Sequence, residues 1–410
     1  MTISSDTVWP DLPPGPHGTP SPALAQRRQS QPMAPMTVPS GDEILTAVRY
    51  PDVRALLNCP YGSRELTAPG LPRMVQGVGA DSVPGVLINM DPPAHTRQRR
   101  ILQGSFTVSA AERWRALCRD IAHDLIAHDL IDSVEGPIMD VVGDYALPLS
   151  SRVICQVVGV PAGDRARFGG WLSAFLSASG DSAEARAHAY GEFLAYAAEL
   201  VAERRRSPGH DLVDDLIQAH DAGDMLSESE LVNVLFMLIT AGHETTALMI
   251  SRGVYRLLLH PDEFRRLVAT PSLIQPAIEE ILRYDGPGSP GLLRHLTAEL
   301  RLPSGTVVPA GAVVLSHLQA ANHDPDAFGD PERFDITRYA PGTATRPHLA
   351  FGHGAHVCLG QALARMELQE ALSALILRIP WLRPAIPLED VEWTTQGLTY
   401  QPVRLPVLLE

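Results

Sequence analysis

The sequence predicts a mainly α-helical protein with a small amount of β-structure. Apolar residues recur at spacings of three and four along most of the chain, which is the pattern of one buried helical face. These segments span residues 97–106, 110–130, 145–158 and 227–259. Short strands are expected at 44–48 and within 307–315, and no internal repeat is present.

The longest predicted helix runs from Ser227 to about Leu259. Ser227 and Glu230 have the spacing of a capping box, which satisfies free N–H groups at a helix start. His260-Pro261 marks the end, because proline does not continue a helix. At about 1.5 Å per residue the helix would extend roughly 45 Å. It is therefore long enough to cross a whole domain.

Composition excludes several classes of function. The chain has 410 residues, 45% of them hydrophobic, and its length alone suggests two or three domains. The formal net charge of −14 argues against a nucleic-acid-binding protein. All 33 basic residues are arginine, so a catalytic Schiff-base or phosphate-binding lysine is excluded. The cysteines lack metal-ligand or disulfide spacing, which suits a reducing cytoplasm. They are Cys59, Cys118, Cys155 and Cys358.

The N-terminal residues 1–40 differ in composition from the rest of the chain. They are rich in Pro, Ser and Gln, so we expect an extension that is extended or disordered, followed by one domain over 41–410. The sequence has no signal peptide pattern. No other stretch looks long and apolar enough to span a bilayer. We therefore expect a soluble, cytoplasmic protein that is not bound to a membrane.

The most informative segment is 351–360, which reads Phe-Gly-His-Gly-Ala-His-Val-Cys-Leu-Gly. Its Cys358 directly precedes an amphipathic stretch at 361–379. Free N–H groups and partial positive charge at a helix N-terminus favour an anionic sulfur. Such a thiolate suits a haem iron. A lone cysteine is more often a small buried hydrophobe, but the flanking glycines favour the ligand interpretation here.

A second candidate segment, Ala241-Gly-His-Glu-Thr-Thr246, lies within the long helix. A mid-helix threonine can bond its hydroxyl to a carbonyl one turn earlier and bend the helix. A polar kink is one interpretation. The other is that Glu244 and Thr245 form an acid–alcohol pair, which proton delivery to iron-bound dioxygen needs.

Two further pairs have helical spacing. Glu280 and Arg283 are three residues apart, which in isolation is an ordinary ion pair. His95 and Arg99 are four apart on the first turns of a predicted helix and could bind a carboxylate or phosphate. Without context, a solvated basic face is the better explanation of the second pair.

Together these segments resemble the cytochrome P450 family, in particular soluble bacterial members that receive electrons from separate proteins. The resemblance covers about residue 41 to the C-terminus and rests on motifs in the family's order. These are 91–100, 241–246, Glu280-x-x-Arg283, 320–322, 334–338 and 351–360. It implies a single-domain P450 fold, a helical prism with a small β-rich lobe, in place of two or three domains.

The resemblance assigns roles to the residues that match its motifs. Cys358 would be the axial iron ligand of haem b (iron protoporphyrin IX), and Glu244 and Thr245 would route protons while O2 is the co-substrate. The haem propionates would be bound by His95, Arg99, Arg294 and His356. Four further positions would border the cofactor: Phe351, Gly352, Gly360 and Ala241.

A structural network is implied as well. Glu280 and Arg283 would bind a downstream arginine. Arg338 matches the bacterial pattern and Arg333 a variant of it, so the third member stays open, with Arg338 as the preferred choice.

The resemblance further implies a monooxygenase that inserts one oxygen atom from O2 into a medium-to-large, mainly apolar natural product, by hydroxylation or epoxidation in secondary metabolism. By family position the pocket walls come from 71–89, 168–195, the helix before Gly242, 287–293 and 393–400. Its predicted lining residues are aliphatic: Met74, Val83, Val86, Leu87, Leu238, Leu292 and Leu293.

Electrons would come from a ferredoxin and a ferredoxin reductase, because no flavin or iron–sulfur motif is present. One alternative is oxidative coupling, ring formation or desaturation of an aromatic or amino-acid-derived substrate. A remote alternative is a haem-binding protein without turnover.

Overall fold

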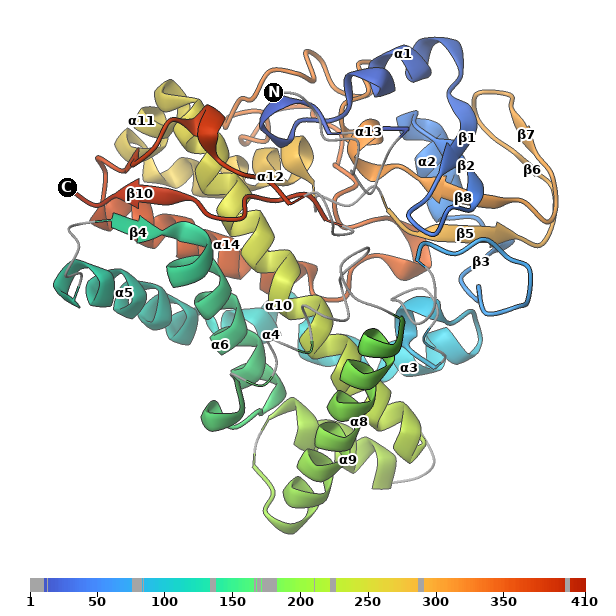
Figure 1. The fold of residues 1–410 in the computed structure, drawn as a ribbon, viewed down its shortest axis with the longest axis horizontal. Helices are drawn as coiled ribbons and strands as arrows, with labels where there is room; N and C mark the ends of the chain where they lie inside the picture. The colour runs from blue at the N-terminus through green and yellow to red at the C-terminus, as the bar shows by residue number, and fades with distance from the viewer. Residues whose placement is uncertain are drawn as a thin grey trace.

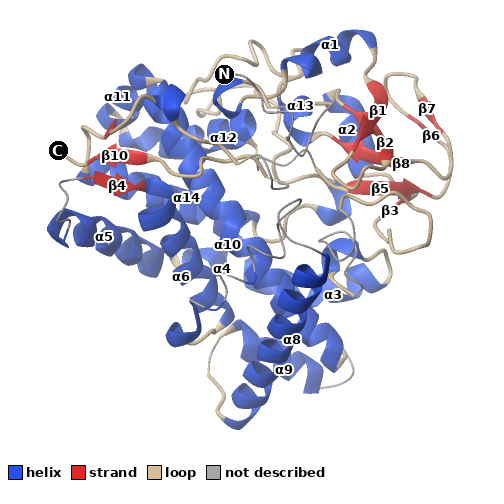
Figure 2. Ribbon diagram, viewed as in Figure 1, coloured by secondary structure: helices blue, strands red, loops and turns tan. Residues whose placement is uncertain are grey.

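The computed structural model shows a mainly helical molecule with a small β-rich lobe at one end (Figures 1 and 2). It describes residues 11–12, 14–75, 83, 85–132, 138–165, 167, 171, 183–209, 211–221, 226–286, 291–394 and 399–410. The helices within these ranges are α1 (Pro22–Ser30), α2 (Tyr50–Leu57), α3 (Ala94–Leu102), α4 (Val108–Glu112), α5 (Arg115–Asp132), α6 (Leu147–Val158), α8 (Ala183–Arg206), α9 (Leu212–Asp221), α10 (Glu228–Leu259), α11 (Pro261–Ala269), α12 (Ile274–Asp285), α13 (Leu318–Asn322) and α14 (Gln361–Arg378).

The long helix α10 runs through the middle of the molecule, in yellow-green in Figure 1. Its predicted capping box is present: the Ser227 hydroxyl accepts from the Glu230 N–H, and the Glu230 carboxylate accepts from the Ser227 N–H. α10 packs against α6, α8, α12 and α14. It continues without interruption through Ala241–Thr246, so the expected kink is absent from this described part of the helix.

By length and composition α10 could cross a membrane, contrary to the expectation that no such stretch exists. Its most apolar window is 67% buried inside the protein. This burial is that of a core helix.

The β-lobe is built on a five-stranded sheet in the order β1-β2-β8-β5-β3. Its strands are β1 (Met33–Thr37), β2 (Glu43–Ala47), β3 (Gly62–Ser63), β5 (Leu293–Leu296) and β8 (Val313–Ser316). β2 and β8 are parallel, with Leu45 opposite Val314, and the other pairs are antiparallel. A three-stranded sheet has the order β4-β10-β9, with β4 at Ile138–Asp140, β9 at Arg383–Pro384 and β10 at Pro406–Leu408. A two-stranded sheet consists of β6 (Leu300–Arg301) and β7 (Val307–Val308).

Part of the N-terminal extension is ordered, and the expectation of an extended or disordered 1–40 is wrong for the helical residues 22–30. α1 is a helix, and β1 pairs with β2 from Met33 opposite Ala47 to Thr37 opposite Glu43. Pro35 is tolerated because β1 is the edge strand of the sheet. The partner strand supplies the hydrogen bonds that composition alone does not reveal.

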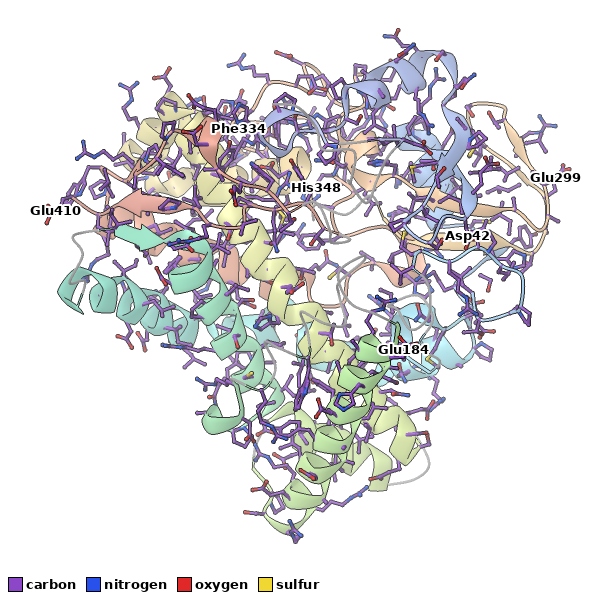
Figure 3. All side chains as sticks on the ribbon, viewed as in Figure 1. Asp42, Glu184, Glu299, Phe334, His348 and Glu410 are labelled. Atoms are coloured by element: carbon purple, nitrogen blue, oxygen red, sulfur yellow. The ribbon has the colours of Figure 1, made fainter. Side chains whose placement is uncertain are left out.

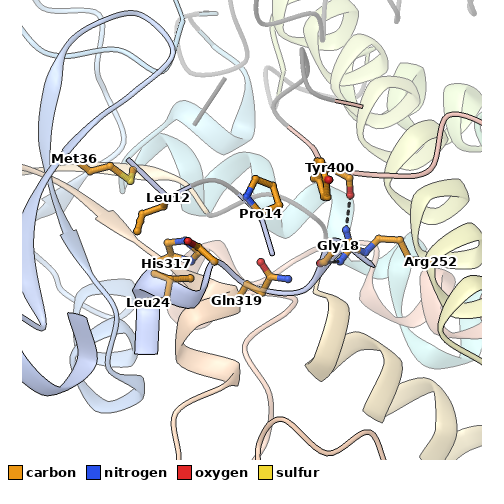
Figure 4. Close-up of a pocket in the computed structure, with 10 residues that line it drawn as sticks. Leu12, Pro14, Gly18, Leu24, Met36, Arg252, His317, Gln319 and Tyr400 are labelled. Carbon is orange, nitrogen blue, oxygen red and sulfur yellow. Dashed lines mark hydrogen bonds between the residues drawn. The ribbon is translucent and has the colours of Figure 1, made fainter. Parts of the chain in front are cut away.

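The segment before α1 contacts the helical core. The carbonyl oxygens of His17 and Gly18 accept from Arg256 (3.1 Å) and Arg252 (2.7 Å), two buried side chains of α10. Both guanidinium groups also bind Asp285 of α12. Beside these contacts lies a small pocket of about 40 Å³ (Figure 4). Its lining residues are Leu12, Pro14, Gly18, Ser21, Leu24, Met36, Arg252, His317, Gln319 and Tyr400.

Candidate active site

The cysteine loop is folded tightly in front of α14. Gly352 and Gly354 have φ angles of +73° and +77°, in the left-handed region that glycine adopts without strain. The Cys358 N–H donates to the Phe351 carbonyl over 2.8 Å, which closes the loop. Burial raises the pKa of the Cys358 thiol, whereas the Gly360 N–H and the Arg99 and Arg365 guanidiniums favour the thiolate. A cation bound at the sulfur would therefore stabilise the thiolate against the cost of its burial.

The four residues predicted to bind propionates come from α3, from β5 and from the cysteine loop itself. The His95 ring of α3 lies 4.2 Å from the His356 ring, centroid to centroid. Arg99, one turn further along α3, donates to the Val357 carbonyl over 2.8 Å. Arg294 of β5 is buried and donates to the Gly62 carbonyl over 3.2 Å.

Several donors in this group lack an acceptor. Both ring nitrogens of His95 and the Nε of Arg294 are buried without a hydrogen-bond partner among the described residues. Burial, and after it the positive charge of Arg294, lowers the pKa of His356 to about 2. Unsatisfied buried donors are costly. This set of two arginines and two imidazole rings therefore fits the carboxylates of an acidic cofactor bound beside Cys358.

The acid–alcohol pair lies on an accessible turn of α10. Ala241 and Thr245 are exposed although they lie in the middle of the central helix. The Thr245 hydroxyl donates to the Ala241 carbonyl over 2.7 Å, the local bond predicted for a mid-helix threonine. Burial raises the pKa of Glu244 to about 7. A carboxyl group with this pKa can both hold and release a proton near neutral pH.

The glycine of this turn allows close helix packing. A Cβ on Gly242 would lie 2.6 Å from the Cδ1 of Ile154 on α6. Ser150 of α6 donates its hydroxyl to the carbonyls of Gly242 and His243, at 3.0 and 2.8 Å. α6 thus fixes the turn that carries Glu244.

The buried network contains Glu280, Arg283 and Arg338. Arg283 binds both carboxylate oxygens of Glu280, at 2.7 and 2.8 Å, and Arg338 binds it at 3.1 Å. Glu280 and Arg283 are fully buried, whereas the Arg333 side chain is 64% exposed and lies 3.8 Å from Asp335. Of the two candidate arginines, Arg338 and not Arg333 is the one that binds Glu280 beside Arg283.

Sequence reasoning missed Arg365 of α14. Its Nε donates to Glu279 over 2.6 Å, and its guanidinium lies 4.4 Å from the centre of the Phe351 ring. His348, labelled in Figure 3, contacts the same Glu279 carboxylate at 3.0 Å. Arg365 lies seven residues after Cys358, on the helix that follows the cysteine loop, and this closeness in sequence was the available signal.

The structure does not bring the seven predicted pocket residues into one cluster. Met74 and Leu293 pack in the apolar core of the β-lobe. The larger helical core contains Val83, Val86, Leu87 and Leu238. Leu292 is partly buried. Much of the remaining predicted wall, at 76–82, 84, 168–170, 172–182, 287–290 and 395–398, lies outside the described residues.

Comparison with known proteins identifies the family. The family model described as "Cytochrome P450" matches residues 173–269 and 272–404. The chain belongs to the cytochrome P450 family. Mycinamicin IV hydroxylase/epoxidase of Micromonospora griseorubida is 38% identical over 93% of both chains. Nocardicin C N-oxygenase of Nocardia uniformis is 36% identical over 94% of both chains. A solved structure of the putative thioether synthase SgvP, 32% identical, has a TM-score of 0.89 over 99% of this chain and 100% of that one.

This P450 is an oxidoreductase of the monooxygenase type and acts in secondary metabolism. The family uses a thiolate-bound haem with O2, small-molecule substrates and external redox partners. The residues present fit that cofactor: Cys358 supplies a partly buried thiol in a glycine loop, and His95 and Arg294 supply unpaired donors for its acidic groups.

Proposed function

We propose that this P450 hydroxylates or epoxidises a medium-to-large, mainly apolar natural product, and that Cys358 would supply the thiolate that binds the iron of haem b. His95, Arg99, Arg294 and His356 would neutralise the two propionates. When bound, the haem supplies activation of O2, favoured by electron donation from the thiolate. The work of the chain is to hold the cofactor, to exclude excess water and to deliver protons.

Glu244 and Thr245, on the helical turn at 241–245, would deliver the protons. The observation that supports the proposal most is the carboxyl group of Glu244, whose burial raises its pKa to about 7 on the turn that exposes Thr245. A proton held on Glu244 at neutral pH can pass through the Thr245 hydroxyl, or through water bound by it, to the reacting oxygen. A haem protein without turnover would not need this pair.

The substrate class follows from the relatives and from the predicted walls. The aliphatic character of Val83, Val86, Leu87 and Leu238 favours an apolar skeleton. One relative is named for oxidation of mycinamicin IV. We infer that a ferredoxin and its reductase supply the electrons and that the protein works in the cytoplasm.

A second candidate function is oxidative coupling, ring formation or desaturation on an amino-acid-derived substrate. The names of two relatives support this second candidate: one is an N-oxygenase and the other a putative thioether synthase. Both functions use the same haem site and differ in the substrate that the pocket accepts.

Ligand titration of the ferric haem protein tests the proposal. We expect neutral macrolides to shift the haem from low to high spin, and a surrogate ferredoxin and reductase with NADPH to give products with one added oxygen atom. A spin shift only with aromatic or amino-acid-derived ligands would favour the second candidate. Consumption of reductant without product from any ligand class would contradict both.

A further inference from the structure

Arg64 is a fully buried arginine that the sequence motifs do not include. It directly follows β3, whose Ser63 pairs with His295 of β5. Among the described residues, its guanidinium donates to the Ile88 carbonyl at 2.9 Å, the Asn89 side-chain oxygen at 3.1 Å and the Leu293 carbonyl. These acceptors come from two segments that are far apart in the sequence.

Those two segments carry most of the predicted substrate-pocket residues. Ile88 and Asn89 follow Val86 and Leu87 in the loop before α3, and Leu293 begins β5. Asn89 continues the connection, because its side-chain amide donates to the Val83 carbonyl over 3.1 Å. One planar guanidinium thus fixes the spacing between the loop and β5, which a single hydrogen bond could not do.

Arg64 is also linked to the cofactor side of the site. Its backbone N–H donates to the Asp91 carboxylate over 2.9 Å, and the Ser63 hydroxyl donates to the same carboxylate over 2.5 Å. The Asp91 carbonyl accepts the His95 N–H over 2.9 Å at the start of α3. The segment at Arg64 therefore contacts the loop, β5 and Asp91, whose carbonyl accepts from the first turn of the helix that carries His95 and Arg99.

We propose that Arg64 is a positioning residue that sets the shape of the substrate pocket and thereby the position at which the substrate is oxidised. This inference rests on the proposed function. Arg64 acts through the loop at 83–89 and through Leu293, and it does not touch the reacting atoms. The ligand class remains a mainly apolar molecule, and Arg64 decides how that molecule is oriented.

Replacement of the guanidinium tests the proposal. In Arg64→Gln we expect haem content to be retained, ligand affinity to fall about 10-fold, and the ratio of oxidation products to change, because displaced walls misplace the substrate. Arg64→Lys should restore little of the ligand affinity or the product ratio, since a compact ammonium cannot bind these divergent acceptors as a planar guanidinium does. The matched control is Arg28→Gln, which removes another buried arginine that donates to a carbonyl, that of Ala320 at 3.1 Å. Equal changes in both glutamine variants, or an unchanged affinity and product ratio in Arg64→Gln, would overturn the proposal.

A second variant and a second measurement keep the test decisive. Asn89→Ala leaves Arg64 in place and removes the side-chain links from Asn89 to Arg64 and to the Val83 carbonyl, so it should shift the product ratio in the same direction if Arg64→Gln does not fold. Hydrogen–deuterium exchange of the haem-loaded protein needs no substrate. Faster exchange at 85–90 in the Arg64 or Asn89 variants, but not in Arg28→Gln, would support the positioning role. Unchanged exchange would refute that role even if the proposed oxidation itself is wrong.

Discussion

The rings of His95 and His356 lie 4.2 Å apart, and neither nitrogen of His95 has a partner among the described residues. Burial, together with the charge of Arg99, lowers the pKa of His95, and burial likewise lowers that of His356. Each neutral ring keeps one N–H that can donate to a carboxylate, and the nearby positive charges of Arg99 and Arg294 favour an anion at this place. A bound carboxylate would thus connect His95 of α3 with His356 of the cysteine loop.

His95→Phe should therefore weaken haem retention while the fold persists. Loss of one donor to a buried carboxylate costs about 1–3 kcal/mol, so haem should transfer faster to an excess of apomyoglobin. His188→Phe, on an exposed part of α8, is the control and should leave the transfer rate unchanged. A transfer rate in His95→Phe equal to that of the control would contradict the propionate assignment.

The pH dependence of coupling should follow Glu244. A general acid must be protonated to act, and the pKa of this carboxyl is about 7, so product formed per NADPH should decline as pH rises from 6 to 8. Glu244→Gln should give low coupling without this pH dependence. The control is Glu228→Gln in the first turn of the same helix, which should keep the wild-type profile. Product and peroxide are measured together, and a declining profile in Glu244→Gln would count against the assignment.

Thr245→Ala should retain haem and ligand binding but release reducing equivalents as peroxide. The substitution removes the hydroxyl that donates to Ala241 together with the γ-methyl group, and the helix does not depend on that bond. Thr245→Ser keeps the hydroxyl and should restore most of the coupling. Fully coupled turnover in the alanine variant would exclude Thr245 from the proton route.

The helical core was predictable from the sequence because its signals are local. Apolar periodicity and the Ser227 cap predict α10 without knowledge of its neighbours. β1 was not predictable, since a strand that contains Pro35 becomes stable only against β2. Sequence patterns likewise could not separate Arg338 from Arg333, because both fit similar local patterns. The two arginines differ in their burial and in their contact with Glu280, which depend on the folded chain.

Glu280→Gln should be strongly destabilising. Two arginines, Arg283 and Arg338, bind this buried carboxylate, and its neutralisation leaves buried positive charge uncompensated. Breaking such a pair from one side costs about 3–5 kcal/mol. Urea unfolding of the haem-loaded protein measures the loss. Arg333→Gln, which changes an exposed side chain nearby, should alter the free energy of unfolding by less than about 0.5 kcal/mol.

Gly18→Ala should disturb the contact between the N-terminal segment and the helical core. A Cβ at Gly18 would lie 2.5 Å from the Trp393 ring, and its φ of +69° adds backbone strain. Gly41→Ala is a matched control, because Gly41 has φ +90° but nothing within 4 Å of a Cβ. The control should lose about 1 kcal/mol from backbone strain alone. Gly18→Ala should lose about 1–3 kcal/mol more, because the added methyl overpacks against Trp393. Equal losses in thermal unfolding would mean that the N-terminal segment moves away from Trp393 at no cost, and that Arg252 and Arg256 hold it only loosely.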